Sequence, residues 1–189
     1  MKILPIAITV FLSFFAPDGF YDRLSEAAIG LTKTKVTYDG SYFAIPYPNG
    51  DVPANKGVCT DVVVRAYRKM GIDVQKEVHL DMTAHFGLYP KIWGLRRPDR
   101  NIDHRRVPNL QVFFTRFGKK LATTANPADY KPGDLVTWMV DGKLPHIGIV
   151  THKKSARGTP LVVHNIGAGQ VLEDCLFKYP MTGHYRFGS

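Results

Sequence analysis

The order of periodic segments along this chain predicts an α+β fold, in which helices come first and an antiparallel sheet follows. Apolar residues recur at helical spacing in the first part, and short β-rich runs between glycine-containing turns fill the remainder. Helices followed by strands favour an antiparallel sheet over the alternating pattern of a parallel one. The 189 residues, 44% hydrophobic and 22% charged, fit one domain with a sizeable core, for which we expect residues 17–189.

Four helices are expected in the first part of the chain. We place them at residues 18–33, 59–70, 77–89 and from about 109 onward. Asp18 would cap the first helix, whereas Gly71 and Pro90 would end the second and third. Residues 36–57, between the first two helices, are rich in Gly and Pro and indicate extended segments and loops.

The β-rich part predicts four strands, within residues 132–140, 145–152, 159–167 and 183–188. If the second and third form a hairpin in which 150 pairs with 160, His146 lies opposite His164. A shift of one residue would bring Asn165 there instead, and the sequence does not fix the register.

The N-terminus predicts export. Lys2 precedes an apolar run at residues 3–15, which has the length of a secretory signal core. A transmembrane helix needs about 20 apolar residues, so this run is short for a span. We assign residues 1–16 as a signal peptide or N-terminal anchor, which leaves attachment to a membrane open, and we expect a periplasmic or cell-envelope location.

The formal charge of +9 favours an anionic partner, although by itself it is more typical of a solvated basic surface. The basic residues are scattered, and no motif that reads DNA or RNA is present. We therefore expect an anionic cell-wall polymer or peptide as the partner rather than nucleic acid, and we expect a monomer.

Cys59 is the main candidate for chemistry. It begins a helix whose buried face also contains Val62, Val63 and Ala66, so its thiol points inward from the helix N-terminus. That position favours an anion and predicts a lowered thiol pKa. Gly57 would let another part of the chain approach closely. A thiolate nucleophile also needs a base and a group that orients the base.

His146, His164 and Asn165 are the residues of the β-rich half that could supply the base and the orienting group. The alternative for Cys59 is a disulfide with Cys175, the other cysteine of the chain, as expected for an exported protein. No metal or other cofactor is expected, because the chain contains neither HExxH nor CxxC spacing.

Four charged residues near these segments have two interpretations each. Asp61 could cap the helix or contact a cationic substrate group. Asp103, Arg105 and Arg106 could hold a substrate carboxylate or form a structural ion-pair network.

Four motifs in order resemble the NlpC-type cell-wall cysteine peptidases of the papain-like superfamily. They are Cys59 at a helix start, "GDLV" at 133–136, "HIGI" at 146–149 and His164. Segments such as "YPNGDVP", "GVCTDVVVRAYRKMGID" and "VVHNIGAG" are similar to a family of small exported bacterial proteins known as a domain of unknown function. The resemblance implies a papain-like fold, with the Cys59 helix packed on the antiparallel sheet. It also implies Cys59 as nucleophile, His146 as base and acid, and His164 as orienting group, with Asn165 as the fallback.

Three functions remain open from the sequence. The first is an exported thiol hydrolase that cleaves an amide bond in a peptidoglycan peptide. The second is a papain-like acyl hydrolase or transferase that acts on lipid or protein acyl groups. The third is a non-catalytic exported binding domain with a Cys59–Cys175 disulfide.

Overall fold

A computed structural model describes residues 19–188 of the chain. The predicted signal peptide or anchor at 1–16, and the expected cap Asp18, lie outside these residues. Among the helices of the described part, none combines the length and apolar character needed to cross a bilayer.

The four predicted helices are present. They are α1 (Phe20–Leu31), α2 (Cys59–Lys69), α3 (Val74–His85) and α4 (Val107–Phe117), with short 3₁₀ turns η1 (Phe86–Leu88), η2 (Asp103–Arg105) and η3 (Pro127–Asp129). α3 begins earlier than expected because the Asp73 side chain accepts a hydrogen bond from the Lys76 N–H and caps it. α4 also begins earlier than expected, since Pro108 occupies its first turn, where the missing N–H costs nothing.

The main sheet has six antiparallel strands in the order β3-β8-β4-β5-β6-β7. The four predicted strands form its centre: β4 (Leu135–Val140), β5 (Leu144–Lys154), β6 (Pro160–His164) and β8 (Met181–Arg186). Two short edge strands were not predicted, β3 (Lys119–Leu121) and β7 (Val171–Glu173). A separate parallel pair, β1 (Thr37–Tyr38) and β2 (Lys56–Gly57), lies in the region where extended segments and loops were expected.

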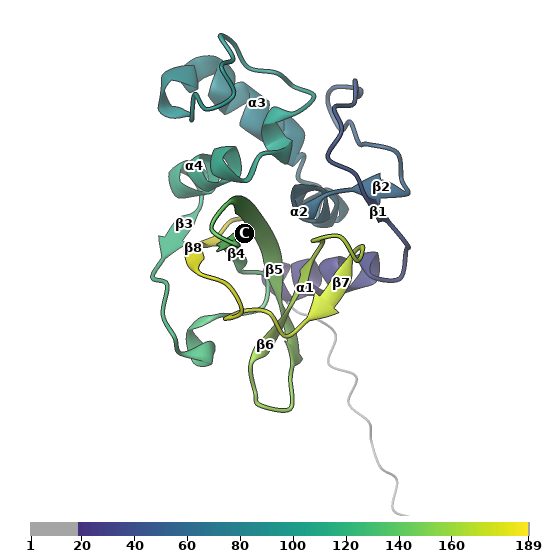
Figure 1. The fold of residues 1–189 in the computed structure, drawn as a ribbon, viewed down its shortest axis with the longest axis vertical. Coiled ribbons are helices and arrows are strands. Elements are labelled where there is room, and N and C mark those ends of the chain that lie inside the picture. The colour runs from purple at the N-terminus through teal and green to yellow at the C-terminus, as the bar shows by residue number, and fades with distance from the viewer. Residues whose placement is uncertain (1–18, 189) are drawn as a thin grey trace, which may run out of the picture.

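The helices are arranged in two tiers relative to the sheet. α1, α2 and α4 pack on the sheet, whereas α3 packs on α2 and α4 and forms one end of the molecule (Figure 1). The buried face of α2, which includes Val62, Val63 and Ala66, contributes to the core between helices and sheet. A smaller core around Trp138 and Leu176 covers the other sheet face. The predicted packing of the Cys59 helix on an antiparallel sheet is confirmed.

The register between β5 and β6 differs from the predicted one. Ile149 pairs with Val163 and Val150 with Val162, so the register is shifted by two residues from the predicted pairing of 150 with 160. Because side chains alternate between sheet faces, a shift of two keeps both histidines on one face. Continued along the strands, this register sets His164 beside Gly148 and diagonal to His146.

Candidate active site

Cys59 occupies the first position of α2, at the wall of a cavity of about 210 Å³. The helix start is fixed by Asp61, whose carboxylate accepts the Val58 N–H at 2.7 Å. Only 5% of Cys59 is exposed, so the cavity gives limited access to a largely buried thiol. Trp93, Ile102, Arg106 and Leu144 are among the other residues that line this cavity, which we call the cysteine cleft.

The parallel pair β1–β2 brings Tyr38 to the cysteine cleft. Tyr38 pairs with Gly57, two residues before Cys59, and also lines the cleft. A Cβ at Gly57 would lie 3.2 Å from the Asp61 Cβ and 3.2 Å from an Arg65 nitrogen. The chain therefore packs closely around Gly57, as predicted, because a larger residue there would press on the residues that hold the start of α2.

His146, His164 and Glu173 form a continuous hydrogen-bonded row across β5, β6 and β7. The His146 Nε2 lies 2.9 Å from the His164 Nδ1, and the His164 Nε2 lies 3.0 Å from the Glu173 Oε2. Trp138, opposite His146 on β4, stacks on its ring with centroids 5.8 Å apart. Both histidines are buried, whereas the Glu173 side chain at the end of the row is 37% exposed.

The row determines which nitrogen of each ring carries the proton. The Glu173 carboxylate can only accept, so the His164 Nε2 must donate to it, which leaves the His164 Nδ1 as an acceptor when the ring is neutral. The His146 Nε2 then donates to that acceptor, and the His146 Nδ1 keeps its lone pair. That Nδ1 is buried and has no hydrogen-bond partner, so it is the atom available to take a proton.

The Cys59 thiol lies beside the strand that carries His146. Backbone N–H groups of Ile147, Thr60 and Cys59 itself approach the sulfur and lower its pKa. Burial outweighs them and raises the thiol pKa to about 12, so the sequence prediction of a lowered pKa is wrong for this structure. Burial, reinforced by His164, also lowers the His146 pKa to about 3. The resting state is therefore a neutral thiol and a neutral imidazole.

His164, not Asn165, is the residue placed against His146. The Asn165 side chain donates to the Gly57 carbonyl at 3.1 Å and accepts from the Gly167 N–H at 3.2 Å. It ties the end of β6 to the segment just before Cys59. Asn165 thus fixes the helix start relative to the sheet, while His164 is in position to orient the base.

Both cysteines are free. Cys175 is buried in the smaller core, and the expected alternative of a Cys59–Cys175 disulfide is not found. The non-catalytic hypothesis loses the feature that motivated it.

Arg105 forms a structural ion pair, one of its two interpretations, and its partner is Asp61, which also caps α2. Their side chains are buried and are joined by bonds of 3.0 Å from Nε to Oδ1 and from Nη2 to Oδ2. Arg105 also donates to the carbonyls of Ser41 and Asp39. Its donors are thereby used within the protein, although the residue borders the cysteine cleft.

Asp103 and Arg106 are also paired, more loosely, at 3.5 Å. Burial raises the pKa of Asp103 to about 6. Arg106 lies over the Trp93 ring at 4.1 Å from its centroid and lines the cysteine cleft. Of the four charged candidates, Arg106 remains the best placed to meet a substrate group.

One set of side chains in the described residues has the composition of a metal site. Ligating atoms of His164, Glu173 and Cys175 lie within 4.8 Å of one another. The His164–Glu173 contact is already at hydrogen-bonding distance, and Lys178 binds the other Glu173 oxygen at 2.9 Å. Both Glu173 oxygens are thus engaged in hydrogen bonds, one with His164 and the other with Lys178.

Two site residues were missed by sequence reasoning, Glu173 and Tyr38. Glu173 follows the glycine-rich turn at 167–169, and a two-residue apolar run at 171–172 was the only sign of the strand that carries it. Tyr38 carried no signal, because only the β1–β2 pairing brings it near Cys59.

The fold therefore sets a cysteine at a helix N-terminus against an antiparallel sheet that carries two hydrogen-bonded histidines. The chain belongs to the family described as "Domain of unknown function (DUF1287)", which matches residues 25–187. The predicted family membership is confirmed.

Among curated proteins, the chain is similar to "Uncharacterized protein YijF" of Escherichia coli (strain K12), with 54% identity over 150 residues. That match covers 79% of this chain and 73% of the relative. Among solved structures, NlpC2 from Trichomonas vaginalis is 16% identical with a TM-score of 0.49, covering 91% of this chain and 48% of that one. NlpC1 from the same organism is 17% identical with a TM-score of 0.46, covering 90% and 45%. The chain spans about half the length of these two NlpC proteins.

Proposed function

We propose that this protein is an exported thiol hydrolase that cleaves an amide bond in a cell-wall peptide. The observation that carries the proposal is the His146 Nδ1, which is buried, unpartnered and held in its proton-accepting form by His164 and Glu173. Cys59, at the N-terminus of α2, packs against the strand that carries this base, so the chain supplies the thiol and the base that nucleophilic catalysis requires.

In the first half of the reaction, the Cys59 sulfur attacks the substrate carbonyl carbon while its proton passes to the His146 Nδ1. The tetrahedral oxyanion receives hydrogen bonds from the Cys59 backbone N–H and from the hydroxyl of Tyr38, which lines the same cleft. The C–N bond then breaks, and His146 returns the proton to the leaving amine. A thioester between Cys59 and the acyl group remains.

In the second half, water attacks the thioester carbon and gives its proton to His146. The C–S bond breaks, the carboxylic acid departs and the thiol is restored, so one water is consumed for each amide bond cleaved. Because the resting pair is neutral, proton transfer accompanies attack in each half.

The substrate class follows from charge and location. The formal charge of +9 suits an anionic polymer, and the N-terminal sequence predicts export, which puts the cell wall within reach. An acyl hydrolase or transferase acting on lipid or protein acyl groups would use the same residues, so the products distinguish the two functions.

The test is digestion of purified cell wall with the protein, followed by mass identification of the released fragments. New amine and carboxyl ends at one peptide bond support the proposal, whereas released fatty acid favours the acyl hydrolase. Cys59→Ala and His146→Ala should each lower turnover, the latter by roughly 10²–10⁴-fold. Cys175→Ala, which removes the other thiol, is the matched control and should retain activity. Equal activity in all variants would exclude this centre.

Export has its own experiment. A reporter fused after Gly19 should be found outside the cytoplasm, because the fusion retains Lys2 and the apolar run at 3–15. A reporter retained in the cytoplasm would remove the argument for a cell-wall substrate.

A further inference from the structure

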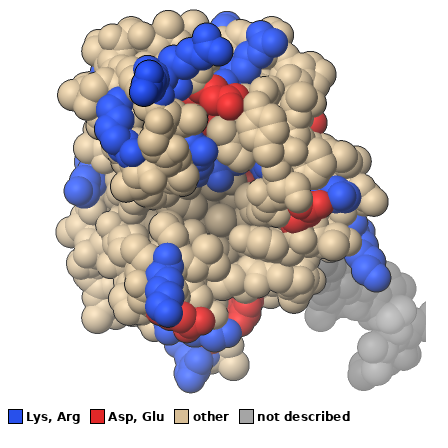
Figure 2. Space-filling model, turned by 45° about the horizontal axis from the view of Figure 1, so that its top comes forward, with Lys and Arg blue, Asp and Glu red and all other residues tan. Residues whose placement is uncertain are grey.

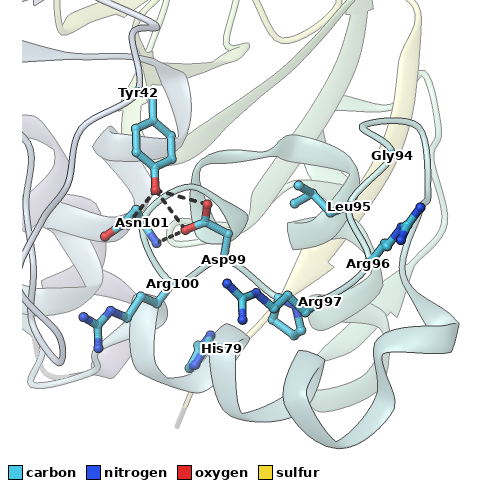
Figure 3. Close-up of a pocket in the computed structure, with 10 residues that line it drawn as sticks. Tyr42, His79, Gly94, Leu95, Arg96, Arg97, Asp99, Arg100 and Asn101 are labelled. Carbon is cyan, nitrogen blue, oxygen red and sulfur yellow. Dashed lines mark hydrogen bonds between the residues drawn. The ribbon is translucent and has the colours of Figure 1, made fainter.

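A second, larger cavity of about 740 Å³ lies next to the cysteine cleft and is rich in arginine. Its wall includes Arg96, Arg97 and Arg100 from the loop after η1, and His79 from α3. We call it the arginine pocket. In Figure 3, Arg97 and Arg100 extend on the side where His79 lies, whereas Arg96 extends toward the opposite end of the loop. Lys and Arg side chains gather at this end of the molecule, above a hollow in the same face (Figure 2).

The loop that carries the arginines is held in shape by its own hydrogen bonds. The Tyr42 hydroxyl donates to the Asp99 carboxylate at 3.1 Å and accepts from the Asn101 side chain at 2.6 Å (Figure 3). The Arg100 carbonyl accepts from the Gln75 side chain at 3.1 Å. The pocket is therefore preformed, and the acid in its wall, Asp99, is engaged with Tyr42.

The positive charges of the pocket lack acidic partners. Within residues 19–188, neither Arg96, Arg97 nor Arg100 forms an ion pair with a carboxylate. Seven other arginines do form such pairs: Arg65, Arg68, Arg105, Arg106, Arg116, Arg157 and Arg186. The His79 Nδ1 is buried without a hydrogen-bond partner, and burial, followed by the nearby Arg100, lowers the His79 pKa. An anionic group would satisfy the guanidinium donors.

The arginine pocket and the cysteine cleft share walls. Gly40, Trp93 and Ile102 line the cysteine cleft. Tyr42, Gly94 and Asn101, which lie one or two positions away from them in the chain, line the arginine pocket. Consecutive Cα atoms are about 3.8 Å apart. A ligand held in the cysteine cleft can thus extend over this thin wall into the arginine pocket.

We infer that the arginine pocket binds a carboxylate-bearing part of the substrate whose scissile amide occupies the cysteine cleft. The inference rests on the proposed function for the position of the amide. Arg97 and Arg100 supply the planar donor pairs that match carboxylates, and the shared wall connects recognition of the acidic group to the point of cleavage.

The experiment measures binding apart from catalysis. The parent is the full chain with Cys59→Ala, and the probe is a mixture of soluble peptides released from cell wall by glycan digestion, used either intact or with carboxyls amidated.

Arg97→Gln with Arg100→Gln should weaken binding of intact peptides by about ten- to a hundredfold. Lys153→Gln with Lys154→Gln removes the same charge from an exposed strand end and should leave binding unchanged. Amidated peptides should bind the parent weakly, and the arginine changes should have little further effect on them.

Equal binding of intact peptides by the parent and the arginine variant would overturn the inference, as would undiminished binding of amidated peptides. Vesicles of phosphatidylglycerol and inorganic phosphate serve as the other anions. If the arginine changes abolish vesicle or phosphate binding but leave peptide binding intact, the pocket serves a different anion and the inference fails. A protein that binds peptides through the arginines but never cleaves them would contradict the proposed function alone.

Discussion

At Cys59, burial and hydrogen bonding act on the thiol in opposite directions. Three backbone N–H groups favour the thiolate, as expected at a helix N-terminus, but removal from water favours the thiol more strongly. The neighbouring His146 is also held neutral by burial. Position on a helix therefore did not by itself predict the charge state, because the depth of the site was unknown from the sequence.

We expect Cys59 to be alkylated slowly by iodoacetamide at neutral pH. A pKa raised to about 12 leaves little thiolate at pH 7, so the rate should increase with pH toward that value. The measurement is the alkylation rate from pH 6 to 10 followed by mass, with Cys175→Ala to isolate the signal. A fast rate that is already constant at pH 7 would indicate a preformed thiolate–imidazolium pair instead.

Glu173 is expected to act as a positioning residue for the base. Glu173→Ala should lower kcat by about 10- to 100-fold, because His164 loses the acceptor that fixes its tautomer. The Glu173 charge raises the pKa of both histidines, so its removal should also move the acid limb of the pH–rate profile to lower pH. Lys178→Met is the control, since it removes the other partner of Glu173 and leaves the contact with His164. A lower rate with an unmoved acid limb would mean that Glu173 is only structural.

At the scale of elements, the β5–β6 pairing assembles the base. Gly148 leaves no room for a side chain between the strands: a Cβ there would be 2.6 Å from the Val162 Cγ1 and 3.2 Å from the His164 Cβ. Without a side chain at this position, His164 can pass across to reach His146. The glycine of the "HIGI" motif is thus explained by the geometry of the site.

Gly148→Ala should therefore separate β5 from β6. We expect a loss of about 1–3 kcal/mol in the free energy of unfolding, as for other overpacked sites, and a larger relative loss in activity because the His146–His164 bond is stretched. Urea unfolding and turnover measure the two effects. Gly87→Ala, where an added Cβ meets nothing within 4 Å, is the matched control. A Gly148→Ala protein with parental activity would show that this spacing does not matter.

For the whole molecule, the pH dependence of stability comes from neutral groups buried by the fold. Burial lowers the pKa of His104 and of His146 to about 3, whereas a histidine in the unfolded chain titrates near 6.5. Between these values the unfolded chain binds more protons, so stability falls as pH decreases. Asp103, with its pKa raised to about 6, opposes this between about pH 3.8 and 6, but burial also lowers the pKa of His164 and of His79, which act in the same direction as His104 and His146.

We therefore expect the urea midpoint to be lower at pH 5 than at pH 7.5. His104→Gln should reduce the difference between the two midpoints, because it removes one of the buried histidines with a lowered pKa from the balance. Chemical unfolding at both pH values, followed by far-ultraviolet circular dichroism, tests this. A midpoint that is higher at pH 5 would mean that carboxyl groups dominate the balance.

The sequence by itself determined the α+β order, the four helices and the central strands, and it named Cys59, His146 and His164 as the candidate site residues, because these depend on local periodicity, turn residues and short motifs. Only the tertiary structure decided the register that joins the two histidines, the placement of Asn165 away from them, the part played by Glu173 and the charge state of the thiol. These depend on contacts between residues far apart in the chain and on burial. The arginine pocket is a mixed case: its three arginines lie within residues 96–100 of the sequence, but only the tertiary structure adds α3 and Tyr42 to its wall.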